Sequence, residues 1–368
     1  MAVAVAVTVR VAVTVLVLAA RGVELVQATP PSASDETATT VLNRATLMTT
    51  SSSSRDFLRD FIEEDIARGA GVAADADSLL GRRHCATKYT SPVGKQGARN
   101  RRIGRLESMV MGSGPPLVML PGLAPENGRP VGPIRSGEIG TMAHFADQFT
   151  VHWLGRPTQL SSGTTFAELA AETAAALREE FAEPVHLLGL STGGSLALNV
   201  AAEHSDTVRR LVIISSGSRL DGHALSTQRA MIRIAATGRT RLTMAAFAWD
   251  IVPPWRGRIP AAVTMFVSGP RLYPRARGLR DLHATLVAEE SFDLRALPAI
   301  TAPTLIVNGG RDRFYERSIV DETAELIPGS RLLVFPERGH VTVVSDRRAV
   351  GAAKSFLSVR DRDSQTSL

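Results

Sequence analysis

A serine, an aspartate and a histidine in this 368-residue chain could together perform nucleophilic catalysis. Ser191 occupies the centre of a Gly-x-Ser-x-Gly pattern, between an apolar run over 185–190 and an Ala- and Leu-rich stretch over 195–202. The apolar run predicts a buried strand, and the following stretch predicts a helix. A strand–turn–helix unit with a serine at its turn is typical of a nucleophile elbow, which holds that serine exposed above a sheet. The alternative is an ordinary turn rich in glycine and serine.

An acid and a base for this serine follow later in the chain. Asp312 comes after the apolar run 303–308 and a pair of glycines, where its carboxylate could accept a hydrogen bond from an imidazole. His340 follows the next expected strand, over 332–335, and is therefore expected on a neighbouring loop. Each residue taken alone could be an ordinary loop residue. The order serine, aspartate, histidine, with each residue after a strand end, favours a catalytic triad.

Two backbone N–H groups are candidates for binding the negative oxygen that develops when a serine attacks a carbonyl carbon. The N–H of Thr192 opens the helix after the serine, where backbone donors have no intrahelical acceptor. The N–H of Leu123 follows the apolar run 117–120 in the sequence Pro121-Gly122-Leu123. Each such donor can lower the barrier by about 3 kcal/mol. We therefore predict an oxyanion hole formed by Leu123 and Thr192.

Short apolar runs alternate with helical patterns from residue 103 to residue 358. The expected strands cover 117–120, 150–154, 185–190, 209–215, 303–308 and 332–335, and the expected helices cover 166–181, 195–202, 317–327 and 347–357. This alternation predicts an α/β fold, a mostly parallel doubly wound sheet with helices on both faces. Functional sites in such sheets lie outside the carboxyl ends of the strands, where Leu123, Ser191 and Asp312 are expected.

Residues 218–292 interrupt this alternation after the strand 209–215. The segment carries several bulky apolar residues, namely Phe247, Trp249, Trp255, Met265, Phe266 and Tyr273. We expect a helical cap over the site, and the aromatic residues favour an apolar small-molecule substrate. The alternative is an excursion of the chain whose aromatic residues only bury one another.

Composition argues against several other classes of site. The net charge of +6 comes almost entirely from arginine and is interpreted as a compositional bias, because no clustered basic face or nucleic-acid-binding motif accompanies it. We therefore expect no nucleic-acid partner. The single cysteine, Cys85, excludes an internal disulfide and a cysteine-rich metal site, and 189–194 lacks the lysine of a phosphate-binding loop. Four histidines lack metal-ligand spacing and are interpreted as structural: His144, His152, His186 and His204.

The first 102 residues differ in composition from the rest. Residues 1–28 are mostly apolar, interrupted by Arg10, and are interpreted either as a secretory signal ending at Val26-Gln27-Ala28 or as a spurious N-terminal extension. Residues 29–102 are expected to be disordered or weakly structured, and 359–368 to form a C-terminal tail. We expect a cytoplasmic protein, because secretion or membrane association would require the N-terminal apolar segment to be a genuine signal or anchor.

Four stretches together resemble the α/β-hydrolase superfamily: Gly-Pro-Pro-Leu-Val-Met-Leu-Pro-Gly at 114–122, Gly-Leu-Ser-Thr-Gly-Gly at 189–194, Ala-Pro-Thr-Leu-Ile-Val-Asn-Gly-Gly-Arg-Asp at 302–312, and Ile-Pro-Gly-Ser-Arg-Leu at 327–332 with Gly-His at 339–340. The resemblance covers roughly 103–358 and implies an α/β-hydrolase fold with a cap. It also implies that Ser191 is the nucleophile, Asp312 the acid and His340 the base, with the amides of Leu123 and Thr192 as oxyanion donors. The chain departs from many members in having Pro121 where they have a histidine that supports the oxyanion loop.

The triad and the resemblance together predict a serine hydrolase that cleaves carboxylic esters or lactones through an acyl-serine intermediate, without metal or cofactor. Acyl transfer, carbon–carbon bond hydrolysis and cofactor-free haloperoxidase chemistry use the same triad and stay open as alternatives. An alternative of another class is a non-catalytic ligand-binding protein on the same scaffold. The serine at the elbow argues against epoxide hydrolases and haloalkane dehalogenases, which carry an aspartate there.

Overall fold

The computed structural model describes residues 97–220, 222–251, 255–272, 279–290 and 299–359. All of these residues belong to the second of the two units of the chain, Val93–Leu368. The interpretations given above for residues 1–28, for 29–96 and for the tail from residue 360 onward concern parts of the chain outside the described residues.

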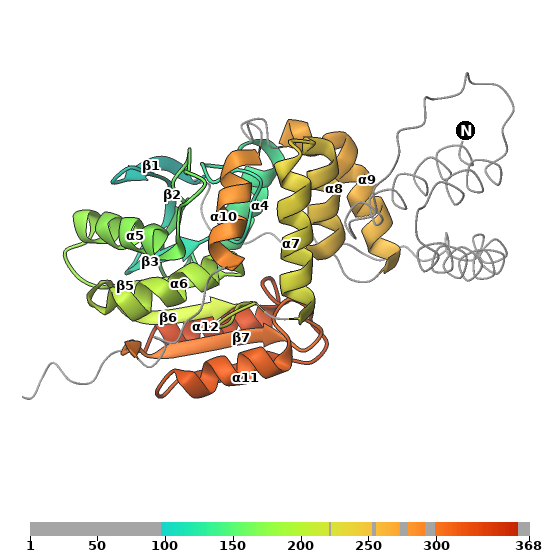
Figure 1. Cartoon of the computed structure of the whole chain (residues 1–368). Helices are drawn as coiled ribbons and strands as arrows, with labels where there is room; N and C mark the ends of the chain where they lie inside the picture. Colours follow the sequence, from blue (N-terminus) through green and yellow to red (C-terminus); the bar gives the residue numbers. More distant parts are fainter. Residues whose placement is uncertain (1–96, 221, 252–254, 273–278, 291–298, 360–368) are drawn as a thin grey trace, which may run out of the picture. The chain divides into compact units, whose positions relative to one another are not determined.

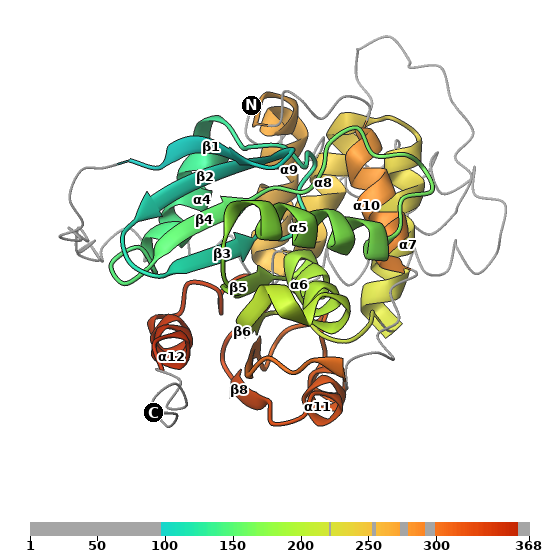
Figure 2. The same cartoon turned by 90° about the vertical axis from the view of Figure 1, so that its left-hand side faces the viewer.

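In the described part of the second unit, an eight-stranded sheet forms the centre of the fold (Figure 2). Its strands, in chain order, are β1 (Arg99–Ile103), β2 (Leu106–Gly112), β3 (Pro116–Leu120), β4 (Thr150–Leu154), β5 (Val185–Leu190), β6 (Val208–Ile214), β7 (Thr304–Gly309) and β8 (Arg331–Phe335). They lie side by side in the order β1-β2-β4-β3-β5-β6-β7-β8. The pairs β1–β2 and β2–β4 are antiparallel, and all the other pairs are parallel. The carboxyl ends of the parallel strands therefore share one edge of the sheet.

Helices cover both faces of this sheet (Figure 2). One face packs against α5 (Phe166–Glu180), α6 (Thr192–Glu203) and α11 (Arg317–Leu326), and the other against α4 (Gly132–Ala143) and α12 (Arg347–Leu357). Adjacent residues of β5 point to opposite faces, since Leu187 belongs to the first core and Leu188 to the second, and both are fully buried. A strand covered on both faces is apolar throughout, which explains its uninterrupted apolar run in the sequence. The predicted doubly wound α/β fold is confirmed.

The structure contains two strands and one helix that the sequence pattern did not predict, namely β1, β2 and α4. β1 also moves the start of the fold from the predicted Ile103 to Arg99. Four of its five residues are exposed because it lies at the edge of the sheet, so its sequence is polar and contains three arginines. Charged residues on an edge strand discourage pairing with another chain. The prediction of a disordered or weakly structured segment over 29–102 is therefore wrong at residues 99–102, which belong to this strand.

Between β6 and β7, the described residues form four helices within the stretch 218–292, where the sequence predicted a helical insertion (Figure 1). They are α7 (Gly222–Ala236), α8 (Thr240–Ile251), α9 (Trp255–Leu272) and α10 (Arg280–Glu290). Helices α8 and α9 pack against each other, whereas α10 packs against α7 and α5. Each helix in the described ranges is too short or too polar to span a bilayer.

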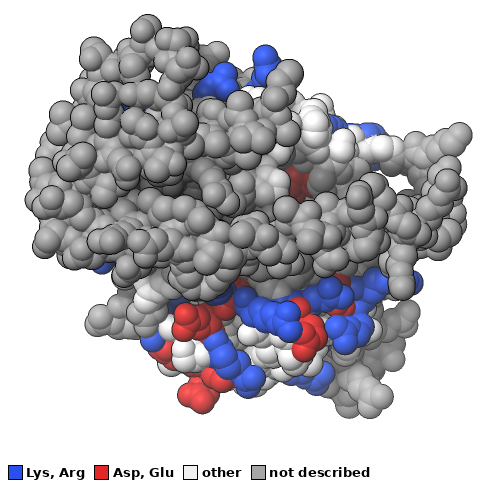
Figure 3. Space-filling model, turned by 90° about the vertical axis from the view of Figure 1, so that its right-hand side faces the viewer, with Lys and Arg blue, Asp and Glu red and all other residues white. Residues whose placement is uncertain are grey.

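Basic and acidic side chains are interspersed on the described part of the face shown in Figure 3. Arginines of the described surface commonly lie in ion pairs, for example Arg317 with Asp321 and Arg219 with Glu322, each at 2.7 Å. Pairing of this kind offsets much of the local positive charge. The absence of a nucleic-acid partner stays a prediction from the sequence.

Candidate active site

Ser191 lies at a sharp turn between β5 and α6, where the Gly-x-Ser-x-Gly pattern predicts it. Its backbone adopts φ 51° and ψ −124°, in a positive-φ region that costs a non-glycine residue on the order of 1–3 kcal/mol. The N–H of Ser191 donates to the carbonyl oxygen of Ile214 at 3.0 Å. Its own carbonyl oxygen accepts from the N–H groups of Gly194 at 2.6 Å and Ser195 at 3.1 Å. These bonds hold the strained turn, and Ser191 stays partly exposed although both of its chain neighbours are buried.

Close backbone packing requires two glycines of the pattern. A Cβ atom added to Gly189 would lie 2.5 Å from the carbonyl oxygen of Gly193, across the turn. A Cβ atom added to Gly193 would lie 2.2 Å and 2.5 Å from the carbonyl oxygens of Leu120 and Pro121. Real Cβ atoms essentially never approach other atoms this closely. The elbow therefore packs directly against the end of β3 and the loop that follows it.

The side chains of Ser191, His340 and Asp312 form one chain of hydrogen bonds. His340 follows β8 and Asp312 follows β7, so both come from loops at the edge of the sheet that carries Ser191. The imidazole Nε2 lies 2.9 Å from the Ser191 Oγ, and Nδ1 lies 2.9 Å from the Asp312 Oδ2. An Nδ1–H that donates to the carboxylate leaves Nε2 unprotonated, so Nε2 can accept the proton of the serine hydroxyl. The structure thus brings together the three residues that the sequence singled out.

Neighbouring groups hold the carboxylate and the imidazole in place. Asp312 Oδ1 accepts hydrogen bonds from the backbone N–H groups of Phe314 at 2.8 Å and Tyr315 at 3.2 Å, which leaves Oδ2 for the imidazole. The Tyr315 ring stacks on the His340 ring with 14° between their planes and 6.1 Å between their centroids. The backbone carbonyl of His340 accepts from the Ser215 hydroxyl at 2.7 Å. Both Asp312 and His340 are buried, so their geometry is set by the protein rather than by water.

The loop after β3 brings Gly122 to the elbow, and Leu123 is the next residue of the chain. A Cβ atom added to Gly122 would lie 3.5 Å from the Cβ of Ser191, so this loop contacts the serine directly. Among the hydrogen bonds of the described residues, the backbone N–H groups of Leu123 and Thr192 have no acceptor. Backbone donors that lack an internal partner and border a nucleophile are suited to bind an oxyanion.

Two buried charged residues next to these donors were not predicted from the sequence. Arg156 follows β4, and its guanidinium donates to the carbonyl oxygens of Pro121 at 2.8 Å and Gly122 at 2.9 Å. Glu289, on α10, accepts a hydrogen bond from the Thr192 hydroxyl at 3.0 Å. A position directly after a central strand, at the same edge of the sheet as the serine, is the sequence signal that could have identified Arg156. Glu289 has no such signal, because it lies on a helix of the insertion.

Burial shifts the pKa values of both groups. Desolvation lowers the pKa of Arg156 to about 10, although the carboxylates of Glu289 and Glu138 oppose the shift. The guanidinium therefore keeps its charge at neutral pH. Desolvation raises the pKa of Glu289, while the hydrogen bond from the Thr192 hydroxyl and the charge of Arg156 act in the opposite direction.

The histidines interpreted as structural lie within or beside the helices and strands. His152 lies in β4 and His186 in β5, each with its ring edge-on to a phenylalanine ring. His144 and His204 directly follow α4 and α6. Burial, aided by the charge of Arg101, lowers the pKa of His152 to about 4. Within the described ranges, no three histidine, cysteine or acidic side chains lie together in a way that could hold a metal ion.

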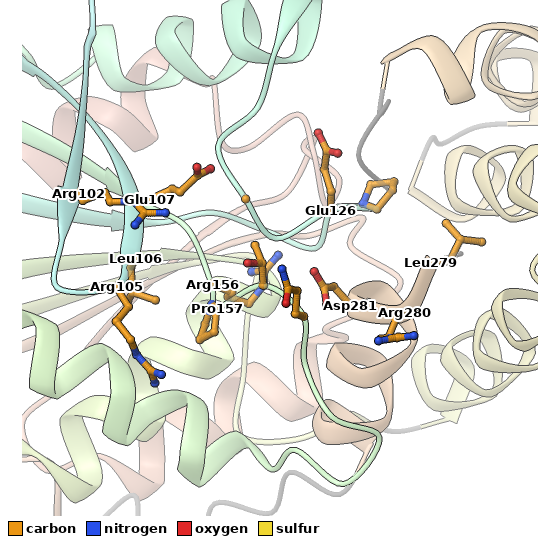
Figure 4. A pocket seen from close by; sticks show the side chains of 14 residues that line it. Arg102, Arg105, Leu106, Glu107, Glu126, Arg156, Pro157, Leu279, Arg280 and Asp281 are labelled. Atoms are coloured by element: carbon orange, nitrogen blue, oxygen red, sulfur yellow. The ribbon is translucent and has the colours of Figure 1, made fainter. Parts of the chain in front are cut away.

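A pocket of about 670 Å³ has Arg156 in its lining. Figure 4 shows Arg156 between Arg102 and Glu107 on one side and Arg280 and Asp281 on the other. The hydrogen-bonded serine, histidine and aspartate do not line this pocket. It is therefore distinct from the place where the serine would meet a substrate, and its charges are of both signs.

Curated relatives of the chain are hydrolases. It is 24% identical over 250 residues to a pimeloyl-[acyl-carrier protein] methyl ester esterase of Nitrosomonas europaea, an alignment that covers 64% of this chain and 92% of that protein. It is 30% identical over 192 residues to a 2-hydroxymuconate semialdehyde hydrolase of Pseudomonas putida, which covers 48% of this chain and 63% of that protein.

Solved structures and a family model agree with the fold. The chain resembles MGS-M2, an alpha/beta hydrolase enzyme from a Medee basin deep-sea metagenome library, with a TM-score of 0.59 and 17% identity over 73% of this chain and 100% of that chain. The model of the alpha/beta hydrolase family matches residues 117–353, which include the elbow and the loops that carry Asp312 and His340. The chain belongs to the alpha/beta hydrolase family.

Proposed function

We propose that this protein is a serine hydrolase that cleaves carboxylic esters or lactones, with Ser191 as nucleophile, His340 as base and Asp312 as the acid. The observation that carries the proposal is the unbroken chain of hydrogen bonds from the Ser191 Oγ through His340 to Asp312, with 2.9 Å at both links. A serine hydroxyl is a weak nucleophile at neutral pH, and a base that is itself oriented by a third group is the arrangement that activates it.

The reaction would proceed in two halves. Ser191 Oγ attacks the carbonyl carbon while His340 Nε2 takes its proton, and the backbone N–H groups of Leu123 and Thr192 stabilise the oxyanion of the tetrahedral intermediate. His340 then protonates the leaving alkoxide, which leaves an acyl group on the serine. Water, activated by the same imidazole, attacks this acyl-serine and regenerates the free hydroxyl. Asp312 keeps the imidazole in the required tautomer and stabilises its cation throughout.

The relatives support the choice of bond, and a contact of the insertion supports a cap. One relative is named as a methyl ester esterase, so ester cleavage occurs among proteins similar to this chain. Glu289 on α10 reaches the Thr192 hydroxyl beside the nucleophile, which supports a role of the insertion as a cap over the site. The apolar substrate stays a prediction from the composition of the insertion.

Hydrolysis assays on the purified full-length chain test this function. The substrates are p-nitrophenyl esters of increasing acyl length and a set of aliphatic lactones. We expect turnover by the wild type and a loss of at least about 10⁴-fold in kcat in Ser191→Ala. Ser161→Ala, which alters an exposed loop serine, is the matched control and should retain full activity. Equal rates for wild type and Ser191→Ala would refute the proposal.

Product analysis separates acyl transfer from hydrolysis, and binding assays address the non-catalytic alternative. With an alcohol present, transesterified product in excess of free acid would replace simple hydrolysis by acyl transfer. Saturable binding of an ester without turnover would instead favour a ligand-binding protein on this scaffold.

A further inference from the structure

Arg156 is a buried cation with an unusual set of acceptors. Its side chain follows β4, is 4% exposed, and directs all its described hydrogen bonds to one short loop region. Nη1 donates to the carbonyl oxygen of Pro121 at 2.8 Å and Nη2 to that of Gly122 at 2.9 Å. Nε donates to Asn127 Oδ1 at 3.1 Å. A buried guanidinium that donates hydrogen bonds to two consecutive backbone carbonyls fixes the course of that backbone.

The second of these carbonyls belongs to the peptide unit that carries the Leu123 N–H. A trans peptide is planar, and its C=O and N–H bonds point in opposite directions. The hydrogen bond from Arg156 to the Gly122 oxygen therefore sets the direction of the Leu123 N–H. Because a Cβ added to Gly122 would lie 3.5 Å from the Ser191 Cβ, this peptide unit borders the nucleophile. A full positive charge on the carbonyl end also polarises the peptide and strengthens its N–H as a donor.

Hydrogen bonds from Arg156 hold the start of this loop, which also packs against Gly193 of the elbow. Pro121 has no N–H and no polar side-chain atom, so it contributes only its carbonyl oxygen, which Arg156 binds. Asn127 in turn holds the arginine, since its Nδ2 donates to the carbonyl oxygen of Pro157 at 3.0 Å and to the Thr285 hydroxyl of α10 at 3.2 Å. The support of the loop is thus anchored in the insertion as well as in the sheet.

We propose that Arg156 is a positioning residue of the reaction: it holds the Gly122–Leu123 peptide so that the Leu123 N–H faces the oxyanion formed at Ser191. The inference rests on the proposed function, because the oxyanion exists only if Ser191 attacks a carbonyl. Lysine would replace the arginine only in part, since a single ammonium cannot span two carbonyl oxygens and an amide in fixed fork geometry.

The test compares Arg156→Met and Arg156→Lys with the wild type as full-length proteins. Loss of one oxyanion donor costs about 10²–10³-fold in kcat, so we expect a misdirected donor to lower kcat by roughly 10- to 100-fold in Arg156→Met, with KM changed less than about threefold. Arg156→Lys should be intermediate. The affinity for a trifluoromethyl ketone, which forms a tetrahedral oxyanion adduct with a serine, should fall in parallel with kcat, whereas affinity for the matching methylene ether, which forms none, should not change.

Two further variants separate positioning from stability. Arg210→Met removes a second buried arginine, on β6, whose guanidinium lies over the Phe356 ring at 5.6 Å. This variant should keep kcat within about twofold of the wild type when it is assayed well below its Tm. Asn127→Ala leaves the guanidinium but removes the acceptor of its Nε, so a smaller loss of kcat than in Arg156→Met is expected. Asn127→Ala also provides the test if Arg156→Met fails to fold.

The outcomes are distinct. Folded Arg156 variants that keep kcat and trifluoromethyl ketone affinity within about threefold of an active wild type would overturn the role of Arg156 and leave the proposed function intact. Losses of the same size in Arg156→Met and Arg210→Met would show a purely structural effect. A wild type without Ser191-dependent turnover would refute the proposed function, and the role of Arg156 with it.

Discussion

Replacing Asp312 by asparagine tests the proposed triad at one atom. In the structure, Asp312 Oδ1 accepts two backbone N–H groups, and Oδ2 faces the Nδ1 of His340 at 2.9 Å. Asparagine has one oxygen and one NH₂ group, so its oxygen must stay with the two backbone donors. The NH₂ group then faces Nδ1, which must accept the hydrogen bond and lose its proton. The proton moves to Nε2, where it points at Ser191.

The magnitude follows from this change of tautomer. A protonated Nε2 cannot take the proton of the Ser191 hydroxyl, so general-base activation is lost while the side chains keep their places. The corresponding change in a serine protease triad lowers kcat about 10⁴-fold, equivalent to about 5 kcal/mol of barrier. We expect a loss of this order in Asp312→Asn, with KM little changed because the carboxylate contacts the imidazole and two backbone N–H groups.

Stopped-flow and steady-state hydrolysis of a p-nitrophenyl ester measure both halves of the reaction. Acylation and deacylation should slow together, because both depend on the same imidazole. Asp147→Asn, which neutralises a surface aspartate paired with Lys354, is the control and should keep kcat within about twofold. A kcat of Asp312→Asn within about tenfold of the wild type would refute the assigned role of the carboxylate.

Three other changes have expected outcomes. Gly193→Ala would place a Cβ 2.2 Å and 2.5 Å from two backbone oxygens at the end of β3, so kcat should fall by about 10²-fold. Gly351 lies in open space on α12. Gly351→Ala is therefore the control, and it should leave kcat unchanged and raise the free energy of unfolding by roughly 0.5–1 kcal/mol. Burial lowers the folded-state pKa of His152 from 6.5 to about 4, so its contribution to stability is complete above pH 6.5 and is lost as the pH falls through 4. We measure the free energy of unfolding in urea at pH 7 and at pH 4. The difference between the two values should be about 3 kcal/mol smaller in His152→Gln than in the wild type. Burial raises the folded-state pKa of Glu289 above the ordinary 4.5 of a glutamate, so the stability that its titration contributes is present below pH 4.5 and is lost as the pH rises. Glu289→Gln should therefore gain stability relative to the wild type between pH 5 and 8, and a pH-independent difference would contradict the shift.

The elements that the sequence predicted best are those whose apolar pattern matches a buried surface. β4, β5 and α12 have the predicted bounds. The two strands contribute residues to both cores, and α12 contributes one apolar face to the second core. The polar edge strand β1 lacks such a pattern, since only one of its residues is buried. In α4 only Met142 is buried, so its sequence has no periodic apolar face that would predict a helix.

The same distinction applies to the site. Ser191, Asp312 and His340 were identified because each follows a strand, and the carboxyl ends of parallel strands converge in any doubly wound sheet. Arg156 also follows a strand, but no local pattern encodes the hydrogen-bond partners of Arg156 or of Glu289. Their partners lie 34 and 35 residues away in the case of Arg156 and 97 residues away in the case of Glu289. Such pairings follow from the folded structure, where the loop after β4 meets the loop after β3 and the helix α10 meets the elbow.

Labelling with a fluorophosphonate probe tests the central claim most directly. The reagent phosphonylates a serine only when a neighbouring base has activated it, and mass spectrometry of the digested protein locates the adduct. We predict a single adduct, on Ser191, in the full-length wild type, and its loss in both Ser191→Ala and His340→Ala. An adduct on another serine, or equal labelling of Ser191→Ala and the wild type, would contradict the assignment of Ser191 as the nucleophile.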